Sequence, residues 1–292
     1  MYVVAGVSGR TGKVAAETLL QSGKKVRVVV RDAAKGEPWR QKGAEVAVAD
    51  VADTAALTRA LQGAAGAYLL LPPNFAATDS LRDNVARTRA IGAAIAASGV
   101  PHVVFLSSIG AQHVDGTGPI RGVHHAEVTL PGAAPKARFT WIRAAYFLEN
   151  VAGVLGAAKA EGILPSMFDP AKRIPMVATR DIGRVAANAL VEGPREGRAA
   201  IVELAGAREV SFEDLAAELS ALLGKKVAAI HVPRAGVKGA LLQAGLPDDL
   251  AGLYDEMAAG IDSGLVAFEE NGARFVRGTV EPAEVLRALV AA

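Results

Sequence analysis

The sequence predicts an α/β protein with a doubly wound parallel sheet and a second, smaller α/β lobe. Short β-branched runs alternate with helix-like segments through the first half of the 292-residue chain. The first run, Tyr2–Ala5, leads directly into three glycines spaced three residues apart, Gly6, Gly9 and Gly12. After about Asn150 the alternation gives way to prolines and further helix-like segments. These three observations are typical of a sheet covered by helices on both faces, with an appended lobe.

The expected strands of the first half are apolar runs suited to a buried sheet. We expect strands at Tyr2–Ala5, Val26–Val30, Glu45–Ala49, Ala67–Leu71, His102–Leu106 and Phe139–Ile142. We expect helices at Lys13–Gln21, at Thr54–Leu61 with Asp53 as its cap, and at Thr78–Ala97. Strands buried on both faces and joined by helices form parallel sheets, which bind ligands beyond the carboxyl ends of their strands. The residues that follow each strand are therefore the candidates for a binding site.

The second half is expected to be mainly helical. We expect helices at Val151–Ala160, Asp181–Leu190 and Ser211–Leu222, a loop broken by prolines over Gly162–Pro175, and a strand at Val227–Val232. The residues after that strand are expected to be helical. We expect residues 1–150, completed by about 176–205, to form the larger domain, and residues 151–175 and 206–292 to form the smaller lobe on the substrate side.

Composition and charge exclude several classes of protein. A net charge of +2, from 32 Lys and Arg against 30 Asp and Glu, is too balanced for general binding to nucleic acids or to membranes. The absence of cysteine excludes disulfides, thiolate catalysis and thiolate metal sites. The five histidines lack the spacing of metal ligands, so no metal is expected. With no bilayer-spanning apolar run and no signal peptide expected before the first strand, we expect a cytoplasmic protein.

The glycine turn Gly6-Val7-Ser8-Gly9-Arg10-Thr11-Gly12 has the pattern that binds a dinucleotide pyrophosphate. The first glycine allows a sharp turn off the strand, the second leaves room for the phosphates, and the third lets the helix pack close to the sheet. Unpaired N–H groups at the start of the following helix attract an anion. We therefore expect contacts to a dinucleotide cofactor from Gly6, Ser8, Gly9, Arg10, Thr11 and Gly12.

Basic residues after the second strand indicate which dinucleotide binds. Arg31 stands where an acidic residue would bind the ribose hydroxyls and repel a 2′-phosphate, whereas a guanidinium attracts that phosphate. Lys35 lies one helical turn later, and Arg10 can face the adenosine end as well. This pattern favours NADP(H) over NAD(H). The alternative is that Arg31 and Lys35 are solvated loop charges.

Three further strand ends contribute candidate residues. Asp50 can accept a hydrogen bond from the adenine amino group, or it can cap a helix instead. Leu71 and Pro72 follow the fourth strand and are expected to border the nicotinamide ribose. Ser107 and Ser108 follow the fifth strand, where we assign Ser107 to the cofactor and Ser108 to a substrate carbonyl.

Together these motifs resemble the NmrA-like branch of the short-chain dehydrogenase/reductase superfamily. The resemblance covers nearly the whole chain and rests on the glycine turn, on Arg31 and on four further segments, Phe105–Ala111, Ile142–Asn150, Pro175–Gly183 and Ser211–Val227. Within the family the chain is most similar to the NAD(P)H:quinone oxidoreductase type. The resemblance implies a Rossmann domain that binds NADP(H), a small C-terminal lobe, and a substrate cleft between them.

The sequence departs from ordinary short-chain dehydrogenases at the catalytic position. Those enzymes use a tyrosine followed by a lysine four residues later, and none of the four tyrosines here has that lysine. By the pattern His-Ala-Glu-Val, His125 takes the lysine position and Arg121 takes the tyrosine position. Hydride addition to a ketone gives a strongly basic alkoxide that needs a proton donor, whereas a quinone gives a less basic phenolate-type anion. Water or His125 can protonate that anion; the alternative is that His125 merely lies on a helix beside the cleft.

Aromatic and basic residues after the sixth strand are candidates for substrate binding. Tyr146 and Phe147 can stack on a planar acceptor, and Arg143 is expected to shape the same cleft. The alternative for these side chains is packing between the two lobes.

The sequence therefore predicts an oxidoreductase. We expect NADPH-dependent hydride transfer to a quinone or a similar planar electrophile, without a Tyr-Lys dyad, by a monomer or homodimer. A non-catalytic NADP(H) redox sensor that binds a protein partner is the main alternative, because such a sensor also needs no dyad. Reduction or isomerisation of another small metabolite is a third hypothesis.

Overall fold

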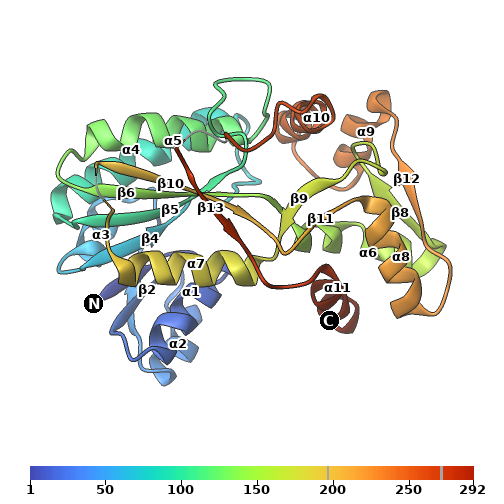
Figure 1. Ribbon diagram of the computed structural model, residues 1–292. Coiled ribbons are helices and arrows are strands. Elements are labelled where there is room, and N and C mark those ends of the chain that lie inside the picture. The colour runs from blue at the N-terminus through green and yellow to red at the C-terminus, as the bar shows by residue number, and fades with distance from the viewer. Residues whose placement is uncertain (196, 270–271) are drawn as a thin grey trace.

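Within residues 1–195, 197–269 and 272–292, which the computed structural model describes, eight strands form one parallel sheet (Figure 1). Their spatial order is β13 (Arg274–Arg277), β10 (Ala199–Ala205), β6 (Arg138–Ala144), β5 (His102–Ser108), β4 (Gly66–Leu69), β1 (Tyr2–Val4), β2 (Val26–Val30) and β3 (Glu45–Val48). Every neighbouring pair in this sheet is parallel. The expected doubly wound α/β fold is confirmed.

Helices cover both faces of this sheet (Figure 1). One face carries α3 (Thr54–Leu61), α4 (Ser80–Ser98) and α5 (Ile120–Ala133), and the other carries α1 (Arg10–Gln21), α2 (Glu37–Gln41) and α7 (Thr179–Glu192). Apolar side chains fill each layer, among them Leu57 and Ile91 on the first face and Leu19 and Ile182 on the second. Among the described residues, no helix is both long enough and apolar enough to cross a lipid bilayer.

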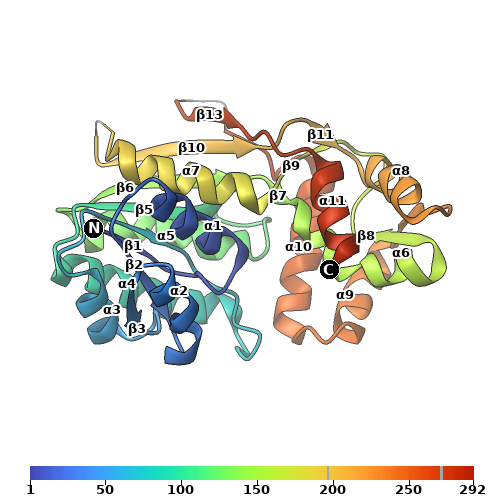
Figure 2. The ribbon, with the colours of Figure 1, turned by 90° about the horizontal axis from the view of Figure 1, so that it is seen from below.

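A smaller lobe stands beyond the carboxyl ends of the sheet strands (Figure 2). Its strands are β7 (Tyr146–Phe147), β9 (Ile174–Val177) and β11 (Glu209–Val210) in one small sheet, and β8 (Ile163–Ser166) with β12 (Ala228–His231) in another. Its helices are α6 (Leu155–Glu161), α8 (Phe212–Leu223), α9 (Arg234–Gln243), α10 (Asp248–Ser263) and α11 (Pro282–Ala291). Phe168 and Phe212 pack edge to face at the centre of the lobe, with ring centroids 5.2 Å apart.

Two helix starts follow from their own sequence. Asp53 caps α3 as expected, because its side chain accepts a hydrogen bond of 3.0 Å from the N–H of Ala56. Ser211 and Asp214 form a capping box at the start of α8, in which each side chain accepts a hydrogen bond from the other residue's N–H. These local signals place both helices within a residue of their expected starts.

Two expectations for the second half are wrong. The segment Gly162–Pro175 is not wholly a loop, because it contains β8 and the first residues of β9. Ile163 begins β8 opposite Ala228 of β12, and Pro165 is tolerated because β8 has a partner on one side only in this two-stranded sheet. The chain after Val232 is not wholly helical, because it contains β13; β10 also lies outside the expected strands. Each of these strands pairs with residues far away in the sequence, so no local pattern reveals it.

The chain returns from the lobe to the sheet before it ends. After α10 it re-enters the sheet as β13, pairs with β10, and crosses back to α11 (Figure 1). Asp181 of α7 holds this crossing, since its carboxylate accepts hydrogen bonds of 3.1 and 3.0 Å from the N–H groups of Thr279 and Val280. A Cβ on Gly278 would lie 2.3 Å from that carboxylate oxygen. One strand of the large sheet therefore comes from residues 206–292, which we expected to belong wholly to the smaller lobe. The expected division into two domains stays a prediction.

Candidate active site

The turn between β1 and α1 is shaped by its glycines. Gly6 has a φ of +70°, a left-handed conformation that turns the chain sharply off β1. A Cβ on Gly12 would lie 2.5 Å from the carbonyl oxygens of Ala5 and Gly6, so glycine is needed for α1 to pack this close to the strand. A Cβ on Gly9 would lie 3.3 Å from the Gly6 oxygen and, apart from its chain neighbours, within 4 Å of no other atom of the described residues. The outer side of the turn is therefore open to a bound group.

The N-terminus of α1 is electrostatically suited to an anion. Gly9 is its N-cap, and no side chain of the described residues caps it, whereas α3 has Asp53 as its cap. The first N–H groups of such a helix carry a partial positive charge and lack intrahelical partners. Ser8, Gly9 and Arg10 are exposed, and Thr11 is buried beneath them. An open, uncapped turn of this kind fits the pyrophosphate of a dinucleotide.

The carboxyl ends of β2 and β3 lie along the same sheet edge as the glycine turn, because the strands are parallel. Arg31 and Lys35 are exposed there, and Asp32 between them caps the short 3₁₀ helix that carries Lys35. Asp50 is also exposed, and its side chain accepts a hydrogen bond of 2.9 Å from the N–H of Ala52. All three candidate residues are accessible to a ligand on this edge, and their cofactor contacts stay a prediction.

The loop after β4 is fixed to α4. The guanidinium of Arg87 donates a hydrogen bond of 2.7 Å to the carbonyl oxygen of Pro72 and pairs with Asp83 at 2.9 Å. Leu71 and Pro72 line a cavity of about 210 Å³ that also reaches Tyr254 of α10. The structure therefore places these two candidates in a recess between the strand ends and the lobe.

Ser107 and Arg143 belong to one buried cluster of charges. Arg143 donates from Nε and Nη2 to the Glu127 carboxylate, at 3.1 and 2.7 Å, and from Nη1 to Glu269 at 2.5 Å. The Ser107 hydroxyl donates to the same Glu127 carboxylate over 2.5 Å. Burial would lower the pKa of Arg143, but the hydrogen bonds and charges of Glu127 and Glu269 outweigh it and raise that pKa. The guanidinium expected to contact substrate is engaged by protein carboxylates.

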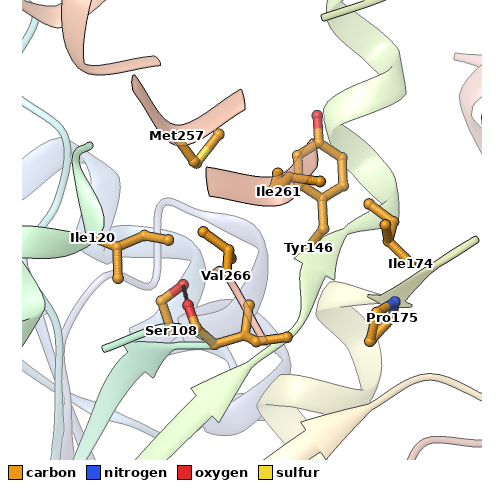
Figure 3. A pocket seen from close by; sticks show the side chains of 9 residues that line it. Ser108, Ile120, Tyr146, Ile174, Pro175, Met257, Ile261 and Val266 are labelled. Carbon is orange, nitrogen blue, oxygen red and sulfur yellow. Dashed lines mark hydrogen bonds between the residues drawn. The ribbon is translucent and has the colours of Figure 1, made fainter. Parts of the chain in front are cut away.

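Ser108 and Tyr146 line an apolar pocket of about 50 Å³ (Figure 3). Side chains converge on it from β5, α5, β7, β9 and α10 and from the loops after β5 and α10, namely Ser108, Ile109, Ile120, Tyr146, Ile174, Pro175, Met257, Ile261 and Val266. The Tyr146 ring packs edge to face on Phe168, with centroids 5.7 Å apart. Burial raises the pKa of Tyr146 to about 12, so its phenol stays neutral at physiological pH.

His125 of α5 lies close enough to Arg89 of α4 for the two charges to interact. Burial, followed by the nearby charges of Arg89 and His124, lowers the pKa of His125. The imidazole of His124 instead turns toward the strand ends, where its Nδ1 lies 2.8 Å from the carbonyl oxygen of Ala111. Ile120 and Glu127 lie on the same helical face as His124, since residues three and four apart share a face. The structure thus places His124, rather than His125, on the face that meets the loop after β5.

Several residues of the family motifs have packing or capping contacts. Phe147 is half-buried against the core shared by α1 and α7. The Glu149 carboxylate accepts hydrogen bonds from the N–H and the hydroxyl of Thr179, at 2.9 and 2.6 Å, and so fixes the start of α7. A Cβ on Gly183 would lie 2.5 Å from the side chain of Val14, which shows how closely α7 packs on α1.

Sequence reasoning missed the carboxylates around Arg143 and the part of the pocket that α10 supplies. Glu203 is a charged residue within an apolar strand run, a pattern that indicates a buried polar partner. Met257 and Ile261 lie four residues apart on α10, but their spacing is equally that of a core-facing helix. The sequence therefore contains a pattern that could have identified Glu203. It contains no pattern that distinguishes pocket-lining residues of α10 from core residues.

The fold and sequence match characterised proteins over most of their length. A family model described as "NmrA-like family" matches residues 2–261. The chain is 28% identical to quinone oxidoreductase 2 of Escherichia coli (strain K12) over 267 residues, which covers 90% of this chain and 89% of that protein. It is 26% identical to the NAD(P)H azoreductase of Xenophilus azovorans, over 89% of this chain and 86% of that protein.

A solved structure with the same fold agrees with these matches. An NADPH-dependent quinone oxidoreductase from Escherichia coli, solved in complex with NADPH, superposes with a TM-score of 0.82 and 25% identity, covering 99% of this chain and 100% of that chain. The likeness extends through the glycine turn, the strand edge and the lobe, because nearly all of both chains is matched. This protein belongs to the NmrA-like family.

Proposed function

We propose that this protein transfers hydride from NADPH to a quinone or a similar planar electrophile. One observation carries the proposal: the carboxyl edge of a single sheet holds an open, uncapped glycine turn and, farther along, an apolar pocket beside the Tyr146 ring. The relatives named as a quinone oxidoreductase and an NAD(P)H azoreductase support the same reaction class.

The protein is an oxidoreductase with NADP(H) as its cofactor, and the strand edge supplies the binding groups. Main-chain amides of the glycine turn bind the pyrophosphate, and Arg31 and Lys35 bind the 2′-phosphate. Asp50 accepts from the adenine amino group, and the loop at Pro72 borders the nicotinamide ribose. Ser107 donates its own proton to Glu127, so its oxygen presents free lone pairs to a ribose hydroxyl.

NADPH supplies the hydride when it is bound, and the chain positions the acceptor. The Tyr146 ring offers a flat face for stacking, and Met257 and Ile261 of α10 exclude water from the pocket. The Ser108 hydroxyl, which donates 3.0 Å to the carbonyl oxygen of Ile109, can redirect its proton to a quinone oxygen. A pocket of about 50 Å³ is smaller than the ~300–1,000 Å³ of typical ligand sites. We therefore expect the walls of the pocket to move apart when an acceptor enters.

The protonation of the reduced acceptor needs no dedicated side chain. A phenolate-type product is a weak base, and water can protonate it. The lowered pKa of His125 keeps its imidazole neutral at neutral pH, where it cannot act as an imidazolium donor. We therefore assign His125 a role beside the cleft rather than in proton transfer, although the sequence places it at the lysine position.

The direct test is stopped-flow measurement of NADPH oxidation with a panel of benzoquinones and naphthoquinones. We expect turnover with at least one small quinone and faster turnover with NADPH than with NADH. Tight binding of NADPH without turnover of any quinone would refute hydride transfer to this class. A protein partner that co-purifies with only one redox form of the cofactor would then favour the sensor alternative.

A further inference from the structure

A short segment after α10, residues 264–269, closes one side of the acceptor pocket; we call it the strap. It starts at Gly264, which ends α10 with a φ of +82°, and runs along the loop after β5 toward β13. Val266 of the strap lines the pocket beside Ile261 (Figure 3). The position of the strap therefore affects the width of the pocket.

The strap is closely seated along its length. A Cβ on Gly110 or on Gly260 would lie 3.3 or 2.9 Å from the side chain of Val266, so both glycines make room for it. The amide of Gln112 donates a hydrogen bond of 2.8 Å to the carbonyl oxygen of Ala267. These contacts hold the middle of the strap against the loop that follows β5.

The far end of the strap is fixed by charge. Glu269 accepts from Arg143 Nη1 at 2.5 Å, and its own N–H donates to the carboxylate of Glu203 over 2.6 Å. Arg143 and Glu203 face each other across β6 and β10, and both are buried. The other side of Arg143 is held by Glu127, which also binds Ser107 at the cofactor side. One guanidinium therefore connects the predicted nicotinamide end of β5 to the strap.

We propose that Arg143 is a positioning residue that holds Val266 against the acceptor through Glu269, and does not itself bind the acceptor. This rests on the proposed quinone reduction and deepens it, because it assigns acceptor affinity to the strap. A guanidinium that is buried this deeply needs carboxylate partners. Of its two partners, Glu269 on the strap is the more exposed, with 39% of its side chain accessible against 9% for Glu127. The strap contact is thus the one that can open while Arg143 stays paired.

The test uses Glu269→Gln, because replacing Arg143 would leave buried carboxylates without a partner and endanger folding. The matched control is Glu192→Gln at the end of α7. This change removes an exposed ion pair with Arg274, which begins β13 shortly after the strap. We expect Glu269→Gln to raise KM for the quinone about threefold to tenfold with little change in kcat or in NADPH affinity, the range for one half-exposed charged hydrogen bond. Glu192→Gln is expected to leave KM unchanged.

Two further measurements separate this proposal from the proposed function. Hydrogen exchange of the peptide that contains the strap needs no acceptor, and we expect it to be faster in Glu269→Gln and unchanged in Glu192→Gln. Val266→Ala is expected to raise KM as well, and the double variant should raise it by less than the product of the two. Unchanged exchange in Glu269→Gln, or faster exchange with an unchanged KM, would overturn the positioning role. Absence of quinone turnover with faster exchange would instead refute the proposed function alone.

Discussion

The Tyr68 hydroxyl donates a hydrogen bond of 3.0 Å to the Thr11 hydroxyl, and both side chains are buried. This bond joins β4 to the first turn of α1, the turn whose amides we propose to bind the cofactor pyrophosphate. Burial raises the pKa of Tyr68 well above its ordinary value, so the phenol remains a donor at all physiological pH values.

Tyr68→Phe removes that donor and leaves the Thr11 hydroxyl buried without it. We expect a loss of about 1 kcal/mol in the free energy of unfolding, the usual cost of one such bond, and a weaker affinity for NADPH. Urea unfolding and calorimetric titration measure the two effects. Tyr2→Phe, at a half-exposed tyrosine on the neighbouring strand, is the control and should change neither quantity.

Arg31→Glu tests the choice of cofactor. If the Arg31 guanidinium binds the 2′-phosphate, replacing it by a carboxylate should weaken NADPH binding by about tenfold to a hundredfold, while NADH binding changes little. Fluorescence titration with both cofactors gives the ratio of affinities. Lys136→Glu makes the same change of charge at an exposed residue just before β6, away from the carboxyl edge, and should leave the ratio alone. An unchanged ratio in Arg31→Glu would place the 2′-phosphate elsewhere.

Met257→Ala enlarges the acceptor pocket from the side of α10. Because Met257 lines the pocket, we expect kcat/KM for a naphthoquinone to rise relative to that for a benzoquinone by about threefold or more. The loss of a buried side chain will also lower stability, by about 2–5 kcal/mol. Leu286→Ala removes a buried side chain from α11, away from the pocket, so it controls for stability and should not alter the ratio of substrates.

His125→Gln tests the assignment of the proton source. If water protonates the product, the variant should keep turnover within about threefold of the original protein and keep the same pH profile between pH 6 and 8. The measurement is the pH dependence of kcat at saturating NADPH and quinone. A loss of a hundredfold or more, with a changed pH profile, would restore His125 as the donor that the motif position indicates.

The buried His102 makes the stability of the fold depend on pH. Burial lowers the pKa of His102 from 6.5 to about 4, and its imidazole lies 3.0 Å from the Thr140 hydroxyl. The unfolded chain takes up a proton on this group below pH 6.5 that the folded chain refuses until about pH 4. Stability should therefore fall across that window, by about 3 kcal/mol from this group.

His102→Gln should flatten this dependence between pH 6.5 and 4, whatever its effect on stability at neutral pH. Urea unfolding at pH 7.5, 6 and 5 measures the slope. His231→Gln, at an exposed histidine of β12, should keep the slope of the original protein. A slope that is the same in all three proteins would mean that other groups cause the acid sensitivity.

Local chemistry made much of the cofactor side predictable. Gly6 and Gly12 indicate a turn and a close approach because glycine favours a left-handed backbone and leaves room for neighbouring backbone atoms, and the structure has both features. The inner strands of the first half were predictable because a strand buried on both faces is apolar throughout, whereas the edge strand β3 is exposed at both ends. The positions of the side chains after each strand then followed from the parallel order.

The acceptor side was not predictable in the same way. Arg143 follows buried residues at the end of a strand, which suggests a substrate contact, but its partners come from Glu127 on α5 and Glu269 on the strap. The direction in which His125 points depends on how α5 is rotated about its axis relative to α4. The spacing of residues in the sequence does not fix that rotation. Strands β8 and β13 have four residues each, and β8, β10 and β13 all pair over long sequence separations, so their formation depends on tertiary contacts.

The return of the chain to the sheet at β13 has a consequence for biosynthesis. One of the two outermost strands, β13, is synthesised only after α8, α9 and α10, so a nascent chain must hold β10 without this neighbour during that time. An unpaired strand edge is a template for association with other chains. Early release of the polypeptide, before residue 274, should therefore yield a product that aggregates rather than a smaller nucleotide-binding protein.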